Sequence, residues 1–278
     1  MEIVWEERYR KMLTPPARKL ATSSSGRALS FSGGGLVAAA YHLGVFEGLS
    51  AKSQTQLDLH NGPLVGASAG ALVCAVLAAG CHYDDAVNSL GRIVDSVRAA
   101  RAGPLSCDIL RLVRPELEGL LPEDAHQSCS GRAVIFVTDV STRPWLPVLL
   151  SEWDSRSALI DSILTSSYIP GLTSRRSPVG GGPLIDGGFS GSNFPVHPTA
   201  AQTVRVSPFS AGELDICPEV RTSSKPRSVM LPSKVSLDVT RANASAIRAT
   251  LWPPRDVTWL HSQLELGFND ACRWLKKQ

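Results

Sequence analysis

One run of the chain, Asn61–Tyr83, contains no Asp, Glu, Lys or Arg, and it constrains the fold more than any other feature. Its length alone is that of a membrane-spanning helix. However, its first half holds Gly62, Pro63 and the pentapeptide Gly66-Ala67-Ser68-Ala69-Gly70, which disfavour a continuous helix. The run therefore predicts a short apolar strand over 63–65, a tight turn, and a buried helix over 69–79.

Two more glycine turns follow candidate strands. The segment 27–31 predicts a strand that leads into Gly33-Gly34-Gly35 and then into an alanine-rich helix over 36–49. The apolar pair at 184–185 leads into Asp186-Gly187-Gly188. Three glycine-rich turns that each end a strand are typical of βα units.

The remaining pattern completes an α/β class. The segment 132–139 is rich in β-branched residues and predicts a central strand, 203–206 predicts another, and 157–164 predicts a helix. Strands that alternate with helices indicate a mostly parallel sheet covered on both faces.

The ends of the chain are assigned from composition and period. Residues 1–26 are predicted to be an N-terminal arm, and residues 27–278 a single domain. The segment 210–234 combines Pro, Ser and mixed charge and predicts a loop or flap, whereas 257–275 has apolar residues at helical spacing. That helix is expected to pack on the domain, with contact to a membrane as the alternative.

Composition excludes several classes of protein. The net charge is only +3 and no basic block with interleaved aromatics occurs, so we expect no nucleic-acid partner. The six cysteines form no CxxC pair and no Cys/His cluster with zinc-ligand spacing, so we expect reduced thiols, no metal and no cofactor. The charged N-terminus lacks an apolar signal segment, which favours a cytoplasmic location.

The chemistry is best indicated by GASAG. In a GxSxG motif between a strand and a helix, small neighbours permit a strained turn that pushes the serine oxygen outward. We therefore take Ser68 as a candidate nucleophile, with Gly66 and Gly70 as the supporting glycines.

The triple glycine can supply an anion site. Successive glycines at a helix N-terminus let backbone N–H groups converge on an anionic oxygen, such as that of a tetrahedral intermediate. Gly33, Gly34 and Gly35 are the candidate donors. A phosphate-binding loop of the Walker type is excluded because no GK[ST] follows, and the dinucleotide pattern is incomplete at Ala38.

The base that would serve Ser68 is left open by the motifs alone. An α/β-hydrolase requires the order Ser, Asp or Glu, His, and both His197 and His261 lie downstream. The early part of the chain holds few strands for that fold, which speaks against it. Asp186 is another candidate, because the two glycines that follow it, Gly187 and Gly188, are typical of a tight turn that would carry its carboxylate.

Taken in order, these motifs resemble the patatin-like phospholipase family. The resemblance extends over residues 29–275 and is nearest the branch that includes adiponutrin and adipose triglyceride lipase. It rests on the triple glycine, GASAG, the DGG turn and the following segments: Tyr41-His42-Leu43-Gly44, Ser167-Tyr168-Ile169-Pro170, Val206-Ser207-Pro208-Phe209-Ser210, Asp215-Ile216-Cys217-Pro218 and Leu251-Trp252-Pro253-Pro254.

The resemblance implies a three-layer α/β/α sandwich and a catalytic dyad. By the matching motifs, Ser68 is the nucleophile, Asp186 activates it, and Gly33, Gly34 and Gly35 form the oxyanion hole. The implied reaction forms an acyl-enzyme and then hydrolyses or transfers the acyl group, without a metal. Lipid acyl esters are the implied substrates, reached from the surface of a membrane or lipid droplet.

The chain departs from the family after the triple glycine. Val37 and Ala38 stand where many members have a basic residue and a glycine, and the interval to Tyr41 is one residue longer. This departure motivates an alternative function, a catalytically weak or inactive lipid-binding regulator on the same fold.

Overall fold

The computed structural model describes residues 26–51, 57–100, 108–190, 195–198, 200–211, 214–219, 228–230, 236–251 and 258–278. The predicted arm 1–26 lies outside these ranges except for Gly26, so its boundary stays a prediction. Most of the predicted loop 210–234 also lies outside them.

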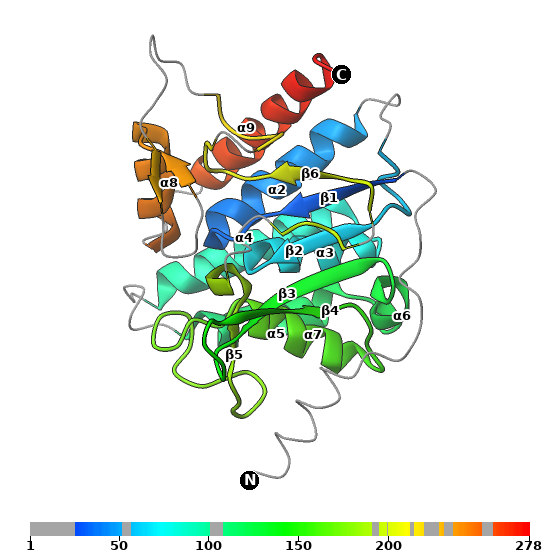
Figure 1. Cartoon of the computed structure of the whole chain (residues 1–278), viewed down its shortest axis with the longest axis vertical. Helices are drawn as coiled ribbons and strands as arrows, with labels where there is room; N and C mark the ends of the chain where they lie inside the picture. The colour runs from blue at the N-terminus through cyan, green and yellow to red at the C-terminus, as the bar shows by residue number, and fades with distance from the viewer. Residues whose placement is uncertain are drawn as a thin grey trace.

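A six-stranded sheet forms the centre of the molecule (Figure 1). Its strands are β1 (Arg27–Phe31), β2 (Leu64–Ala67), β3 (Ala133–Asp139), β4 (Leu146–Leu150), β5 (Leu184–Asp186) and β6 (Gln202–Val206). The order is β4-β3-β2-β1-β6, and β5 also pairs with β3. Strands β6, β1, β2 and β3 are parallel to their neighbours, whereas β4 and β5 run antiparallel to β3.

Helices connect and cover the strands. They are α2 (Gly35–Ser50), α3 (Ala69–Ala78), α4 (Tyr83–Ala99), α5 (Ile109–Leu120), α6 (Ala125–Cys129), α7 (Arg156–Ser166), α8 (Arg241–Leu251) and α9 (Thr258–Leu275). Because β1, β2 and β3 follow one another in the same direction across the sheet, right-handed crossovers place α2 and the helices between β2 and β3 on one face.

The main hydrophobic core lies between that face and the helices. It joins apolar residues of β1, β2 and β3, such as Phe31, Leu64 and Ile135, to buried residues of α2, α3, α7 and α9. The opposite face carries a smaller cluster of Val65, Ala67, Val134 and Phe136. The expected α/β class, with a mostly parallel sheet flanked by helices, is therefore confirmed.

Helices α2 and α9 pack unusually closely, and Figure 1 shows them side by side. A Cβ atom added to Gly44 of α2 would lie 1.9 Å from the carbonyl oxygen of Leu264, and one added to Gly267 of α9 would lie 2.1 Å from that of Tyr41. The Tyr41 hydroxyl donates to buried Asp270 of α9 at 2.7 Å. The C-terminal helix thus packs on the domain, which is the first of the two predicted alternatives.

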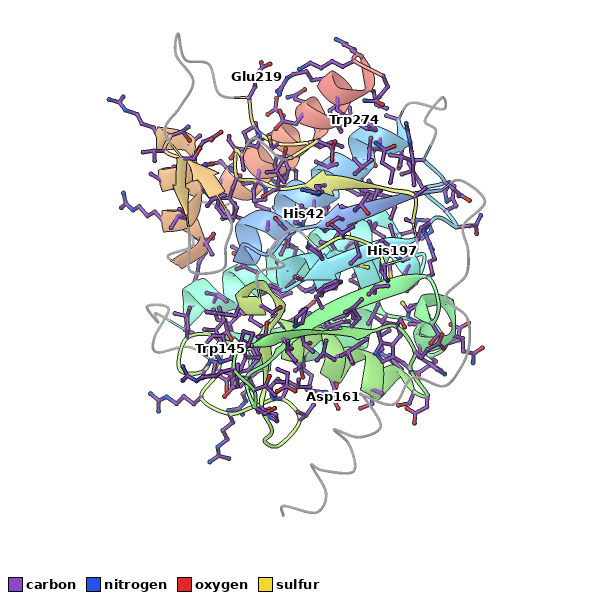
Figure 2. All side chains as sticks on the ribbon, viewed as in Figure 1. His42, Trp145, Asp161, His197, Glu219 and Trp274 are labelled. Carbon is purple, nitrogen blue, oxygen red and sulfur yellow. The ribbon has the colours of Figure 1, made fainter. Side chains whose placement is uncertain are left out.

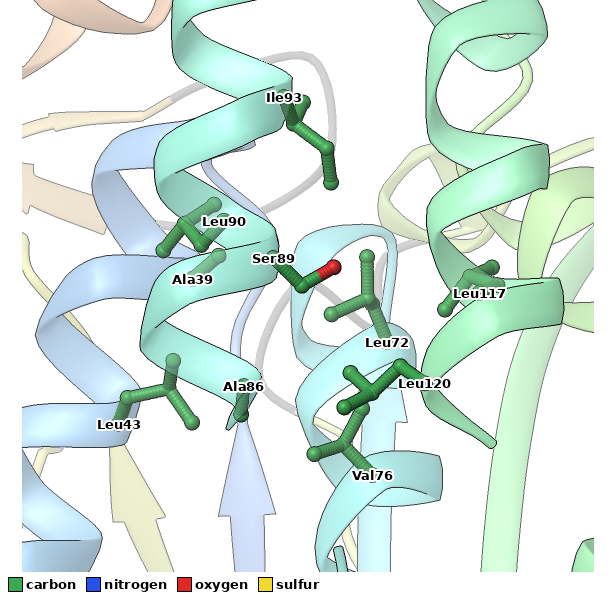
Figure 3. Close-up of a pocket in the computed structure, with 10 residues that line it drawn as sticks. All are labelled: Ala39, Leu43, Leu72, Val76, Ala86, Ser89, Leu90, Ile93, Leu117 and Leu120. Atoms are coloured by element: carbon green, nitrogen blue, oxygen red, sulfur yellow. The ribbon is translucent and has the colours of Figure 1, made fainter. Parts of the chain in front are cut away.

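A small apolar cavity lies between α2, α3, α4 and α5 (Figure 3). Its lining is Ala39, Leu43, Leu72, Val76, Ala86, Ser89, Leu90, Ile93, Leu117 and Leu120. It leaves room for about one water molecule, so it is a packing gap and too small for an acyl chain.

Most elements built around the predicted motifs are confirmed within one or two residues. The strand at β4, the helices α4, α5, α6 and α8, and the short hairpin of β7 (Ser228–Met230) and β8 (Ser236–Asp238) were not predicted. The predicted loop over 210–234 is wrong at Ser228–Met230, because these residues form a strand that pairs with β8. No helix in the described ranges is long and apolar enough to cross a membrane.

Candidate active site

Ser68 occupies a strained turn between β2 and α3. Its φ of 56° makes it the only non-glycine residue with positive φ in the described part of the chain. The turn is tight because Gly66 and Gly70 touch: a Cβ atom on Gly66 would lie 2.3 Å from the Gly70 carbonyl oxygen. Ser68 remains partly exposed, as a nucleophile must be. An outward-pointing serine held at a cost in backbone strain matches the geometry that GASAG predicts.

Asp186 meets this turn because β2 and β5 lie end to end along β3. Ala67, the last residue of β2, pairs with Phe136 of β3, and Asp186, the last residue of β5, pairs with the next residue, Val137. The strands run in opposite directions, so their carboxyl ends face each other. Ser68 and Asp186 consequently share one place beside β3, although they are far apart in the sequence.

Glycine is required where these two strand ends meet. A Cβ atom on Gly187 would lie 2.2 Å from the Phe136 carbonyl oxygen and 3.2 Å from the Ala67 Cβ atom. The N–H of Gly188 donates to the Asp186 carboxylate at 2.8 Å. The DGG motif thus combines a close approach with a backbone donor that holds the carboxylate.

The Asp186 carboxyl is buried, and burial raises its pKa from 3.8 to about 6. Hydrogen bonds from the Ser68 side chain and from the Gly188 N–H oppose this rise in pKa, because they favour the ionised form. A carboxylate with a raised pKa that is hydrogen-bonded to a serine hydroxyl can accept the serine proton near neutral pH.

The end of α7 supports both residues, which the motifs alone did not reveal. The buried Ser166 hydroxyl accepts a hydrogen bond from the Ser68 N–H at 2.9 Å and donates to the Phe136 carbonyl at 2.6 Å. The Asp186 N–H donates to the carbonyl of Tyr168 at 2.8 Å. The sequence signal for this support is the segment Ser167-Tyr168-Ile169-Pro170, which contributes to the family resemblance but does not indicate what its residues do.

The glycine loop lies at the same end of the sheet. Phe31 pairs with Gly66, and because β1 and β2 are parallel, the turns that follow them leave the sheet together. A Cβ atom on Gly70 would lie 2.1 Å from the Phe31 carbonyl oxygen. The N–H groups of Gly33, Gly34 and Gly35 have no acceptor among the described residues, so they are available as donors.

The two residues that depart from the family pattern after the triple glycine, Val37 and Ala38, lie inside α2. Gly34 precedes the helix with φ 139°, Gly35 begins it, and Val37 and Ala38 are buried in its first turn. On the far side the loop is fixed by α8, because the Thr250 hydroxyl donates to the Gly34 carbonyl at 2.9 Å. The apolar pair is therefore part of the core, not a lining of the site.

Of the two candidate histidine bases, His197 lies at the opposite end of the sheet from Ser68, and His261 lies on α9. The His197 N–H donates to Thr203, which pairs with Ala28 near the amino end of β1, whereas Ser68 follows the carboxyl end of β2. Figure 2 shows His197 on the right of the sheet. His261 is exposed in the first turn of α9. Within the described ranges, no group of three His, Cys, Asp or Glu residues could hold a metal ion.

Comparison with known proteins gives consistent matches. The family model of patatin-like phospholipases matches residues 29–200. Patatin-like phospholipase domain-containing protein 2 of Mus musculus is 31% identical over 90% of this chain and 50% of its own length. The 1-acylglycerol-3-phosphate O-acyltransferase PNPLA3 of Homo sapiens is 32% identical over 91% of this chain and 51% of its own.

A third relative carries a transfer activity in its name. The omega-hydroxyceramide transacylase of Homo sapiens is 29% identical over 90% of this chain and 46% of its own length. The chain thus spans about half the length of the curated relatives it matches. The family model covers more than half of the chain and includes both Ser68 and Asp186, so the chain belongs to the patatin-like phospholipase family.

Proposed function

We propose that this protein is a lipid acyl-ester hydrolase that works through a Ser68–Asp186 dyad. The observation that carries the proposal is that the strained Ser68 and the buried Asp186, whose carboxyl has its pKa raised to about 6, meet where β2 and β5 end beside β3. The family assignment supports the substrate class, because its relatives are named as phospholipase, acyltransferase and transacylase proteins.

The reaction begins when Asp186 accepts the Ser68 proton and Ser68 Oγ attacks the ester carbonyl carbon. The carbonyl oxygen becomes an oxyanion, which the N–H groups of Gly33, Gly34 and Gly35 would stabilise. The C–O bond then breaks, and the leaving alcohol takes the proton from Asp186. Water or a second alcohol then attacks the acyl-enzyme and gives its proton to Asp186. Ser68 leaves with that proton, which releases an acid or a new ester.

Transfer to an alcohol is a second outcome of the same acyl-enzyme. The names of two relatives, an acyltransferase and a transacylase, favour it as an accompanying activity. We place the activity in the cytoplasm at the surface of a membrane or lipid droplet, because long-chain esters reside there.

The alternative is a lipid-binding regulator without turnover. Its motivation, Val37 and Ala38, lies in the buried first turn of α2 and leaves the Ser68–Asp186 contact in place. The geometry therefore favours catalysis.

Labelling with a fluorescent fluorophosphonate tests the proposal. Wild type should be labelled, whereas Ser68→Ala should not be, and Asp186→Asn should be labelled at least about a hundredfold more slowly because the base is lost. Ser262→Ala, which removes an exposed hydroxyl of α9, is the matched control and should be labelled like wild type. Folded wild type that is neither labelled nor active on a panel of lipid esters would contradict the dyad and favour the regulator instead.

A further inference from the structure

Large apolar side chains are exposed beside the dyad. Trp145, Leu149 and Phe189 each keep 41% of their surface exposed, and Pro147 is exposed between the first two. The rings of Trp145 and Phe189 contact each other, with centroids 6.4 Å apart and a tilt of 66°. Exposed apolar residues that cluster, instead of standing singly, mark interaction sites.

These residues come from the edge strand β4, the residue before it and a neighbouring short helix. Side chains alternate along a strand, and Val148 and Leu150 of β4 point into the main core. Pro147 and Leu149 therefore point to the opposite face, and Trp145 directly precedes the strand. Phe189 belongs to the 3₁₀ helix η1 (Gly187–Ser190), which contacts β4. We call Trp145, Pro147, Leu149 and Phe189 the aromatic patch.

The aromatic patch is continuous with the candidate active site. Phe189 lies three residues beyond Asp186, and η1 begins at Gly187, the glycine packed between Ala67 and Phe136. Figure 2 shows Trp145 at the left end of the sheet, which is the end where β2 gives way to Ser68. A surface that docks through this patch would therefore bring its molecules to the mouth of the site.

The loops around the aromatic patch are basic. Segment 140–145 holds Arg143, segment 169–183 holds Arg175 and Arg176, and neither contains Asp or Glu. All three arginines are exposed. The two segments meet where the Val140 N–H donates to the Pro183 carbonyl at 2.9 Å. Aromatic rings next to cationic side chains suit the headgroup region of an anionic lipid surface.

We propose that the aromatic patch is the surface by which this protein docks on an anionic lipid–water interface. This docking surface rests on the proposed function, because the lipid ester substrate is taken from it. The occupant is a lipid surface, because the patch adjoins the site of ester cleavage and its flanking charge is positive.

Vesicle flotation in the Ser68→Ala background tests docking without lipid turnover. The protein should float with phosphatidylcholine–phosphatidylserine vesicles and more weakly with phosphatidylcholine alone. The double substitution Trp145→Ala/Phe189→Ala should weaken the partition at least roughly tenfold. Ile247→Ala is the matched control, because Ile247 is also 41% exposed but lies on α8, outside the aromatic patch.

A second variant reports insertion directly. Trp145→Phe keeps an apolar ring and should retain binding, but it should lose the part of tryptophan fluorescence that brominated lipids quench. Replacing Arg143, Arg175 and Arg176 by Glu should abolish the preference for phosphatidylserine. Equal flotation of the double variant and its Ser68→Ala parent, or no flotation of that parent with either vesicle, would overturn the docking surface.

Hydrolysis of a short, water-soluble ester separates this proposal from the proposed function. With Ser68 restored, the double variant should hydrolyse that ester at the wild-type rate and long-chain vesicle esters at least roughly tenfold more slowly. If wild type does not hydrolyse the soluble ester, the result contradicts the dyad and not the docking surface. Unchanged vesicle-ester hydrolysis in the double variant would contradict the docking surface alone.

Discussion

At the scale of single residues, the pKa of Asp186 sets the pH range of activity. The base must be ionised to accept the Ser68 proton, and burial raises its pKa to about 6. We expect kcat/KM for a soluble ester to be constant above about pH 7 and to fall roughly tenfold per pH unit below about pH 6. A profile that is flat down to pH 4.5 would contradict the assigned base.

The same pKa shift has a consequence for stability. Because the folded pKa is raised above 3.8, the contribution of this carboxyl to stability is complete below about pH 4 and is lost as pH rises through about 6. Asp186→Asn should therefore be inactive, yet at pH 8 its free energy of unfolding should exceed that of wild type by up to about 3 kcal/mol. Urea denaturation of both proteins at pH 8 and pH 4.5 measures the difference.

Ser166 is expected to position the nucleophile. Ser166→Ala removes the hydroxyl that bridges the Ser68 N–H and the Phe136 carbonyl, so the strained turn can shift and kcat should fall by at least roughly tenfold with little change in KM. Steady-state kinetics on a soluble ester measure both constants.

Ser162→Ala is the control for that substitution. Ser162 is also fully buried in α7, but its hydroxyl accepts from the Trp153 indole and donates to the Ala158 carbonyl. It should cost a comparable amount of stability and leave kcat unchanged. Equal losses of kcat in the two variants would mean that Ser166 acts only through the stability of α7.

At the scale of elements, the contact between α2 and α9 depends on the absence of side chains. Replacing glycine by alanine inside a helix normally stabilises a protein by about 0.5–1 kcal/mol. Gly44→Ala should instead destabilise by about 2 kcal/mol or more, because its Cβ atom would overlap the backbone of Leu264 and force the helices apart.

Gly91→Ala provides the comparison within the same protein. Gly91 lies inside α4, and the nearest atom to an added Cβ is the flexible Leu260 Cδ2 at 3.9 Å. This variant should be as stable as wild type or more stable. Thermal denaturation followed by circular dichroism ranks the three proteins, and stabilisation by Gly44→Ala would show that the two helices pack less closely.

The elements also show how much of the site the sequence could predict. The strand–turn–helix geometry around Ser68 and the turn at Asp186 depend on adjacent residues, so local sequence patterns predict them correctly. Strand β4 was missed because Pro147 and the exposed Trp145 resemble a loop, and Pro115 inside α5 obscures that helix. The end-to-end meeting of β2 and β5 depends on their register along β3, which no local pattern contains.

At the scale of the whole molecule, two thiols can report how cooperatively the domain opens. Cys74 of α3 and Cys129 of α6 are free thiols without exposed surface in the layer between the helices and the sheet. Burial raises the pKa of both, that of Cys129 to about 12. Since the thiolate is the reactive form, neither should react with a thiol reagent in the folded protein.

We expect these two thiols to become reactive only when the domain unfolds as a unit. A variant that keeps Cys129 and replaces the other cysteines by alanine should be modified at a rate that rises with urea, with the slope given by the equilibrium m-value. A rate that does not depend on urea would indicate that α6 opens locally. Cooperative opening would mean that the strained turn at Ser68 is held by the entire layer of helices, because α3 begins at that turn and its Ala75 carbonyl contacts Cys129 at 3.5 Å.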